Sequence, residues 1–207
     1  MPEIQRLVTA GNRDPQGPPV HQNNVWLVGD GSEVVVVDPA HDGAAVARAV
    51  GDRRVVAIVC THGHWDHVRA ALDFAGRVGD VPVRLAQADG FLWQESHGSR
   101  PFQPLVDGER LPVAGIELQT MATPGHTPGS TSLYVPALVA VLTGDTLFEG
   151  GPGATRWPYS SFAQIIDSIE RRLLTLPPET VVHPGHGSST TIGREAGDLA
   201  AWVARGW

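Results

Sequence analysis

Residues 60–67 read Cys-Thr-His-Gly-His-Trp-Asp-His and crowd four metal-ligand side chains into six consecutive positions. Imidazole nitrogen and carboxylate oxygen are ligands that a borderline metal such as zinc accepts in proteins. Because neighbouring imidazoles repel one another when protonated, this cluster predicts a bound metal rather than a solvated loop. His62 and His64, separated by one glycine, can turn toward one ion, while Asp66 and His67 can face a second.

The residues on either side of the cluster predict its place in the fold. Residues 55–59 are an apolar, β-branched run of the kind that forms a strand buried on both faces. Residues 68–78 space their apolar side chains like one face of a helix. The cluster is therefore predicted on the turn at the carboxyl end of a strand, where open α/β sheets keep their chemistry. Asp66 taken alone would fit a helix cap, but the cluster as a whole favours a metal site.

Three later segments repeat one arrangement, a β-like run followed by a turn of small residues and a ligand-type side chain. Residues 116–121 lead to His126, residues 138–142 lead to Asp145, and residues 181–182 lead to His186. A glycine before each of these side chains lets the backbone turn tightly, so the side chain can point inward at the edge of a sheet. We therefore expect all three to meet the first cluster.

The rest of the pattern indicates an α/β chain of the α+β kind. Strands are predicted at residues 4–9 and 25–28, followed by a hairpin into residues 33–37. Asp42 is predicted to cap a short helix through Val50. Further helices are predicted at residues 89–95, 161–174 and 192–203. We expect one domain over residues 1–207, with two packed mixed β-sheets and helices outside.

The charge balance argues against nucleic acid as a partner. The chain has 15 Lys and Arg against 22 Asp and Glu, a formal net charge of -7, so no general field favours a phosphate backbone. Its single cysteine, Cys60, ends a predicted buried strand and is interpreted as a packed thiol. No signal-peptide pattern and no run of apolar residues long enough to span a membrane is present. We therefore expect a cytoplasmic protein without membrane contact that acts on a small molecule; its oligomeric state is left open.

The motifs His-x-His-x-Asp-His, Pro-Gly-His, Gly-Asp and Pro-Gly-His-Gly between Thr61 and Gly187 resemble those of the metallo-β-lactamase superfamily. The resemblance implies a four-layer αββα sandwich of two mixed β-sheets with two divalent metal ions in its cleft. Zinc is the first choice, and iron or a mixed Fe/Zn pair is the alternative. The implied ligands are His62, His64 and His126 for the first metal, Asp66, His67 and His186 for the second, and Asp145 between them. In such a site Asp66 and Asp145 are the catalytic carboxylates, acting with a hydroxide that bridges the ions.

Within that superfamily the chain is most similar to short thioester hydrolases of the glyoxalase II type. The similarity is carried by residues 144–148 (Gly-Asp-Thr-Leu-Phe), 184–187 (Pro-Gly-His-Gly) and 190–195 (Thr-Thr-Ile-Gly-Arg-Glu). It implies hydrolysis of a thioester between a small acyl group and a low-molecular-weight thiol. Asp145 stands where true β-lactamases commonly have Cys, which disfavours antibiotic hydrolysis.

The sequence departs from this branch in two ways. Many relatives have Gly-Arg-Thr-Asp-Phe after the Gly-Asp motif, where this chain has Gly-Pro-Gly-Ala-Thr-Arg-Trp at residues 151–157. Full-length glyoxalase II has a further helical region that grips glutathione, and we expect no room for it in 207 residues. The carrier thiol is therefore left open between glutathione and another thiol such as mycothiol.

Other activities stay open on the same fold. A persulfide dioxygenase would use one iron held by His62, His126 and Asp145, whereas a lactonase would keep all seven ligands. An RNA phosphodiesterase is disfavoured by the acidic charge balance. A metal-binding module without turnover is also disfavoured, because purely structural metal sites usually close with four ligands.

Two further groups of residues are candidates around the metals. Four residues after the bridging Asp are candidates to line the substrate mouth, with packing or plain surface exposure as the alternative: Phe148, Arg156, Trp157 and Tyr159. Four others are candidates to hold the ligand imidazoles by their outer nitrogens, as such partners commonly do: Asp38, Thr127, Ser130 and His183. Turn capping is the alternative for the first three, whereas a structural hydrogen bond is the favoured interpretation for His183.

Overall fold

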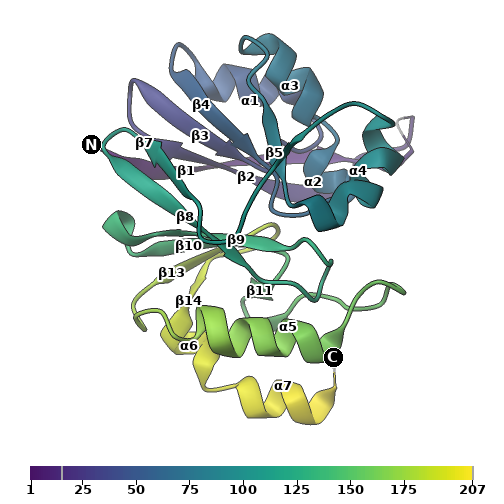
Figure 1. Cartoon of the computed structure of the whole chain (residues 1–207), viewed down its shortest axis with the longest axis vertical. Helices are drawn as coiled ribbons and strands as arrows, with labels where there is room; N and C mark the ends of the chain where they lie inside the picture. Colours follow the sequence, from purple (N-terminus) through teal and green to yellow (C-terminus); the bar gives the residue numbers. More distant parts are fainter. Residues whose placement is uncertain (15, 207) are drawn as a thin grey trace.

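The computed structural model describes residues 1–14 and 16–206, which form four layers in the order helices, sheet, sheet, helices (Figure 1). One sheet has the strand order β1-β2-β3-β4-β5-β6, and the other has the order β14-β13-β10-β9-β8-β7. The αββα sandwich implied by the sequence is therefore confirmed.

The first sheet is antiparallel in its first half and parallel in its second. Its strands are β1 (Glu3–Gly11), β2 (His21–Gly29), β3 (Glu33–Val37), β4 (Arg54–Val59), β5 (Val83–Leu85) and β6 (Gln103–Pro104). β1 to β3 form an antiparallel meander that includes the predicted hairpin, and β4, β5 and β6 then add in parallel. The loop with the first ligand cluster leaves this sheet at the carboxyl end of β4.

The second sheet is antiparallel except where β10 pairs with β13. Its strands are β7 (Arg110–Val113), β8 (Ile116–Ala122), β9 (Thr131–Val135), β10 (Ala140–Gly144), β13 (Val181–Pro184) and β14 (Thr190–Thr191). A separate two-stranded ribbon consists of β11 (Leu147–Phe148) and β12 (Gly151–Pro152). The predicted ligands at His126, Asp145 and His186 follow β8, β10 and β13.

Helices cover the outer face of each sheet (Figure 1). Those on the side of the first sheet are α1 (Gly43–Val50), α2 (Trp65–Val68), α3 (Ala71–Arg77) and α4 (Gly90–His97). Those on the side of the second are α5 (Phe162–Ser168), which continues into a π-turn (Ile169–Leu173), α6 (Ile192–Ala196) and α7 (Leu199–Arg205). Short 3₁₀ turns lie at Gln87–Asp89 and Pro136–Leu138. Asp42 caps α1 as predicted, because its side chain accepts a hydrogen bond from the Ala45 N–H at 2.8 Å.

Three buried apolar clusters lie between the four layers, one in each gap. β3 shows how the sequence produces two of them, since alternate side chains of a strand point to opposite faces. Val34 and Val36 pack toward α1 and α3, while Val35 and Val37 pack against the second sheet. A continuous run of valines is thus suited to a strand that is covered on both sides.

The structure corrects two predicted helices. The single helix predicted at residues 68–78 is interrupted before Ala71, because α2 packs against β2 and α4 whereas α3 packs against α1 and β5. The single helix predicted at residues 192–203 is interrupted at Gly197 and Asp198, and α7 begins at Leu199. Apolar periodicity marks the buried face of a segment, but it does not mark a change of direction between two short helices.

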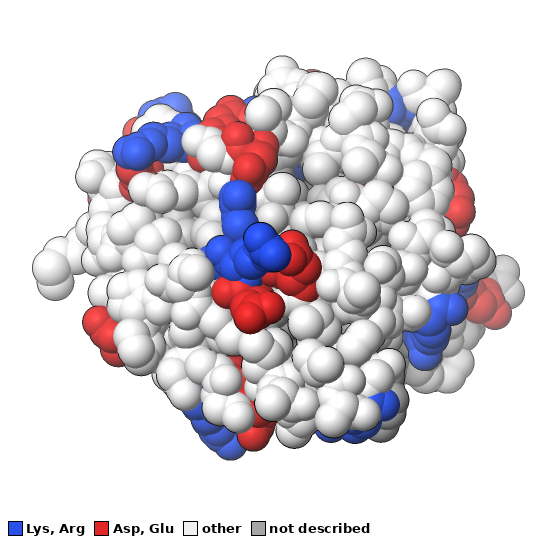
Figure 2. All heavy atoms as spheres, turned by 60° about the horizontal axis from the view of Figure 1, so that its bottom comes forward, with Lys and Arg blue, Asp and Glu red and all other residues white. Residues whose placement is uncertain are grey.

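The surface carries its charges in mixed groups. Figure 2 shows basic and acidic side chains beside one another on the face that includes α5 and α7, within a mostly uncharged surface. Among the described residues, no helix is long and apolar enough to cross a membrane. The expected cytoplasmic location and the absence of a nucleic-acid partner stay predictions.

Candidate metal centre

Four strand ends bring the predicted ligands to one edge of the sandwich. His62, His64 and His126 form the first group, in which Nδ1 of His64 lies 3.0 Å from Nε2 of His62 and 3.0 Å from Nε2 of His126. All three side chains are almost fully buried. Their nitrogens point at a common position, so this group could hold one metal ion.

A second group forms beside the first from Asp66, His67 and His186. Nε2 of His186 lies 3.2 Å from Nε2 of His67 and 3.3 Å from Oδ2 of Asp66. Asp145 reaches both groups, since its Oδ1 is 3.4 Å from Nε2 of His67 and its Oδ2 is 3.6 Å from Nε2 of His126. The structure therefore brings all seven predicted ligands together, with Asp145 between the groups.

The spacing of these atoms fits bound metal ions. Ligand atoms about 2.0–2.2 Å from one tetrahedral ion lie about 3.3–3.6 Å from one another. The close contacts here run from 3.0 to 3.7 Å, and within each group all ligand atoms lie within 4.8 Å of one another. Oδ1 of Asp145 is buried and has no hydrogen-bond partner, so its lone pairs are free to bind a metal ion. Gly185 leaves room for this arrangement, because a Cβ there would lie only 2.4 Å from that oxygen. The residues present therefore fit a pair of metal ions.

Each imidazole of the centre is held from behind by an oxygen atom. The outer nitrogens of His67 and His62 contact Oδ2 of Asp38 at 2.9 Å and Oγ1 of Thr61 at 3.1 Å. The remaining three contacts are those of His126 with the Ala154 carbonyl at 2.7 Å, His186 with the Gln22 carbonyl at 2.6 Å, and His64 with the Tyr159 hydroxyl at 2.9 Å. An oxygen that accepts the outer N–H leaves the inner nitrogen with its lone pair facing the centre, as a metal ligand requires.

The two groups differ in charge in the metal-free protein. Burial lowers the pKa of His64 to about 3, with neighbouring His126 adding to the effect, and burial also lowers the pKa of His62. At the second group burial acts in the same direction, but Asp145, Asp66 and Asp38 together outweigh it and raise the pKa of His67 to about 9. Hydrogen bonds to Asp145 and Asp66 likewise overcome burial and raise the pKa of His186 to about 11. Metal binding at the second group must therefore displace protons.

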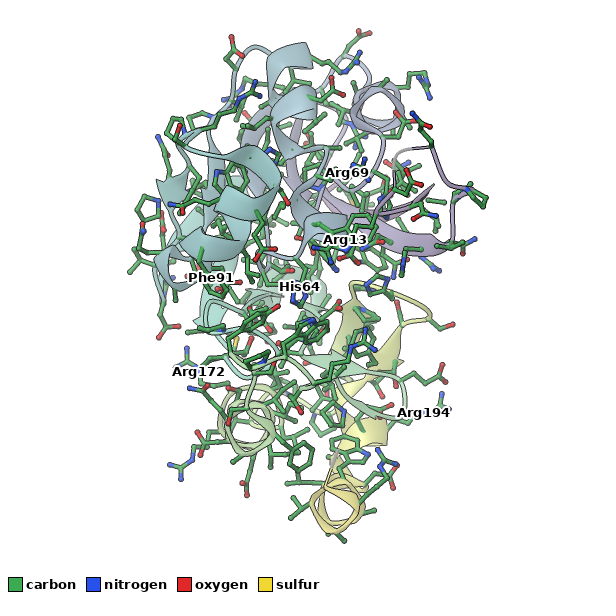
Figure 3. All side chains as sticks on the ribbon, turned by 90° about the vertical axis from the view of Figure 1, so that its right-hand side faces the viewer. Arg13, His64, Arg69, Phe91, Arg172 and Arg194 are labelled. Atoms are coloured by element: carbon green, nitrogen blue, oxygen red, sulfur yellow. The ribbon has the colours of Figure 1, made fainter. Side chains whose placement is uncertain are left out.

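The centre opens into a cleft of about 720 Å³. The four candidate mouth residues all line it, namely Phe148, Arg156, Trp157 and Tyr159. Trp157 packs on the ring of His64 at 4.5 Å, and the Arg156 guanidinium lies 4.8 Å from the Trp157 ring centre. Figure 3 shows His64 where the two sheet layers meet, with Arg13 and Phe91 nearby. Trp157 and Tyr159 thus both line the cleft and contact His64, a predicted ligand.

The residues expected to hold the imidazoles behave differently from one another. Asp38 contacts His67 directly, whereas Thr127 and Ser130 bond to each other at 2.8 Å and to no ligand imidazole. The structural hydrogen bond favoured for His183 is present, because its Nδ1 pairs with Oγ of Ser189 at 2.8 Å and its ring packs on Trp26. The candidate role of His183 as a partner of a ligand imidazole is therefore not supported.

Sequence reasoning missed two buried polar residues that shape the centre. Asp89 accepts hydrogen bonds from the Gly63 N–H at 2.8 Å, the Thr127 hydroxyl at 2.7 Å and the Gly129 N–H at 2.6 Å, and so joins the loops of His62 and His126. Asn23 donates to Oδ2 of Asp66 at 3.1 Å. In the sequence, Asp89 looks like an ordinary helix cap and Asn23 looks like a residue before a strand. Neither position therefore indicated a role in the metal centre.

A four-layer sandwich with paired His and Asp groups at one edge defines the chain as a metal-dependent hydrolase of the αββα class. The model of the metallo-beta-lactamase superfamily matches residues 18–186, and the chain belongs to that superfamily.

Similar proteins agree with this assignment. The chain is 33% identical over 195 residues to "Probable metallo-hydrolase YqgX" of Bacillus subtilis, covering 87% of this chain and 91% of that protein. It is 30% identical over 190 residues to "Hydroxyacylglutathione hydrolase GloC" of Haemophilus influenzae, covering 84% and 90%. A solved structure described as TTHA1623 in a di-iron-bound form has a TM-score of 0.76 and 35% identity, covering 84% of this chain and 92% of that one.

Proposed function

We propose that the protein hydrolyses a thioester of a small acyl group and a low-molecular-weight thiol. The observation that carries the proposal is the pair of three-residue groups joined by Asp145 at the floor of a cleft. The hydroxyacylglutathione hydrolase named among the relatives supports the thioester as the substrate class.

A pair of bound metal ions would supply a water ionised near neutral pH and would polarise the substrate carbonyl. The chain contributes the geometry for this chemistry. Asp66 and Asp145 stay ionised, since the cationic His67 and His186 beside them hold the pKa of each carboxyl below its usual range in spite of burial. They offset much of the positive charge of two divalent ions. The oxygen atoms behind the five imidazoles keep the inner nitrogens aimed at the centre.

The cleft favours a small, partly apolar substrate. Its walls near the ligands are aromatic, formed by Phe148, Trp157 and Tyr159, and Arg156 lies at the exposed rim. The volume of about 720 Å³ lies within the range of small-molecule sites. We propose that the acyl group lies against the aromatic walls and that the thiol carrier extends toward Arg156.

The donor set also bears on the metal. Imidazole and carboxylate ligands suit both zinc and iron, and the similar structure named above contains two irons. We propose zinc as the first candidate, with iron or a mixed pair as the alternative. Elemental analysis of purified protein decides between them.

Hydrolysis assays test the function. Protein loaded in turn with Zn²⁺ and Fe²⁺ is given a panel of acyl thioesters, lactones and a persulfide, with oxygen uptake recorded for the last. We expect thioester cleavage without oxygen uptake, and loss of both metal content and cleavage in Asp145→Ala. Lactone cleavage without thioester cleavage, or oxygen uptake with the persulfide, would replace the proposal by one of the two alternatives on this fold.

A further inference from the structure

Asn23 is a fully buried amide between the metal centre and the turn after β3. Its Nδ2 lies 3.1 Å from Oδ2 of Asp66, and its Oδ1 lies 2.7 Å from Nε2 of His41. Both ends of the amide are therefore engaged, one by a predicted metal ligand and the other by a histidine outside the ligand set.

The chemistry of the partners fixes which way this amide points. Asp66 is ionised and can only accept hydrogen bonds, so the amide must turn its NH₂ group toward it. The amide oxygen then faces His41, and Nε2 of His41 must carry the proton that it donates. Reversing the amide would set an oxygen against the Asp66 carboxylate and an NH₂ group against the His41 N–H.

The surroundings of His41 favour the same arrangement. Its Nδ1 is buried without a hydrogen-bond partner, which suits a nitrogen that carries no proton. Gly11 packs closely against this nitrogen, since a Cβ on residue 11 would lie 2.3 Å from Nδ1. The His41 backbone has φ of +57°, and the Ala40 carbonyl just before it accepts a hydrogen bond from the Thr9 hydroxyl at 2.8 Å. The fold therefore fixes the His41 ring in a position from which it can lock the Asn23 amide.

We propose that His41, acting through Asn23, is a positioning residue for Asp66 and so sets the metal affinity of the second group separately from that of the first. Asn23 also approaches Nε2 of His186 at 3.5 Å, whereas within the described part of the chain its side chain makes no hydrogen bond to a member of the first group. The inference rests on the proposed two-metal centre. It assigns a role in that centre to His41, a side chain that belongs to neither ligand group and does not line the substrate cleft.

The direct test is the variant His41→Phe, which keeps the ring and removes the donor. Stepwise Zn²⁺ dissociation constants are measured by competition with a chromophoric chelator, and anomalous scattering from crystals at limiting Zn²⁺ assigns each constant to its group. We expect the second group to bind Zn²⁺ about 10- to 100-fold more weakly, as is usual when a partner that orients a metal ligand is lost. The first group is expected to keep its affinity.

Two variants separate positioning from general damage. His41→Gln keeps an N–H donor at a similar reach and is expected to restore most of the affinity. His97→Phe is the matched control, because His97 is also half-buried and makes one hydrogen bond from Nε2, to the Val68 carbonyl at 2.9 Å. We expect it to leave the second group unchanged, and thermal unfolding of each metal-free variant verifies that the fold is kept.

A double-variant experiment tests the route through the amide. If His41 acts only through Asn23, His41→Phe costs no further affinity in an Asn23→Ala background. Any one of three results overturns the inference. The first is an equal loss of Zn²⁺ affinity at both groups, and the second is a loss in His97→Phe as large as in His41→Phe. The third is full additivity of the losses in His41→Phe and Asn23→Ala. If wild-type protein binds two Zn²⁺ and cleaves thioesters while His41→Phe binds Zn²⁺ like the wild type, only this inference fails. If the wild type binds no pair of ions, the proposed function fails with it.

Discussion

Asp38 and His67 are joined by a buried hydrogen bond of 2.9 Å between Oδ2 and Nδ1. The same carboxylate accepts hydrogen bonds from the Thr61 N–H and the Thr61 hydroxyl, each at 2.7 Å. Thr61 in turn contacts the outer nitrogen of His62. One carboxylate at the end of β3 therefore orients a predicted ligand of each candidate metal group.

Replacing Asp38 by Asn is expected to weaken both metal groups. The backbone there has φ of +52°, which Asn tolerates, so the change tests hydrogen bonding rather than backbone strain. One amide oxygen cannot serve three donors, and leaving a buried donor unpaired costs about 1–3 kcal/mol of unfolding free energy. Metal analysis and urea denaturation check the two effects. Asp42→Asn, at the exposed cap of α1, is the control and should leave both quantities unchanged, since Asn caps helices as well as Asp does. Wild-type metal content in Asp38→Asn would refute the role.

Tyr159→Phe is expected to weaken Zn²⁺ binding at the first group by about 10-fold or more. The hydroxyl contacts Nε2 of His64 at 2.9 Å, and nothing else in the described structure hydrogen-bonds that nitrogen. Competition titration with a chelator measures the loss. Tyr134→Phe is the matched control because Tyr134 is the other tyrosine of the chain and packs in the cluster under α5. Equal Zn²⁺ affinities for the two variants would mean that Tyr159 lines the cleft but does not orient His64.

Asp89→Asn is expected to loosen the two loops that it joins. The variant amide offers one acceptor to the two backbone N–H groups and the hydroxyl that now bond to the carboxylate, so a loss of about 1–3 kcal/mol in unfolding free energy is expected. Hydrogen exchange of the Gly63 and Gly129 amides should speed up relative to the rest of the chain. Asp107→Asn is a suitable control, because that carboxylate is half-exposed and also accepts a backbone N–H, from Ala122 at 2.7 Å. Unchanged exchange at both glycines would show that Asp89 does not hold the loops.

The ligand positions were predictable because their signal is local. A strand-like run, a glycine turn and a ligand-type residue recur at His126, Asp145 and His186, and the carboxyl ends of neighbouring strands meet at one edge. The glycines before two of them have the positive φ that the pattern requires, +140° at Gly125 and +50° at Gly144. Spacing along the chain thus predicted that these side chains meet at one edge, whereas their division between two metals was implied by the resemblance to the metallo-β-lactamase superfamily.

Two supporting residues, Asn23 and Asp89, were not predictable in the same way. Asn23 contacts a predicted ligand 43 positions away, and Asp89 contacts residues of the ligand loops 26 to 40 positions away, so only the folded chain shows their partners. His183 shows the opposite case, since its nearness in sequence to His186 made it a candidate, whereas its hydrogen bond is to Ser189, as the favoured interpretation had it. Hydrogen bonds between distant segments leave no periodic trace in a single sequence.

His183 leads to a prediction about acid stability. Burial, with the charge of Arg6 adding to it, lowers the pKa of His183 to about 4 in the folded protein, against about 6.5 in an unfolded chain. Between these values the unfolded chain binds a proton that the folded protein does not, so the unfolding free energy is largest above pH 6.5 and falls as the pH drops toward 4. His183→Gln cannot titrate and should lose less stability than the wild type between pH 7 and pH 5. Urea denaturation of both proteins at the two pH values measures how much unfolding free energy each one loses. Protonation of the metal-ligand residues contributes equally to both proteins, so it cancels when the two losses are compared. Parallel losses in the two proteins would contradict the assignment of this acid dependence to His183.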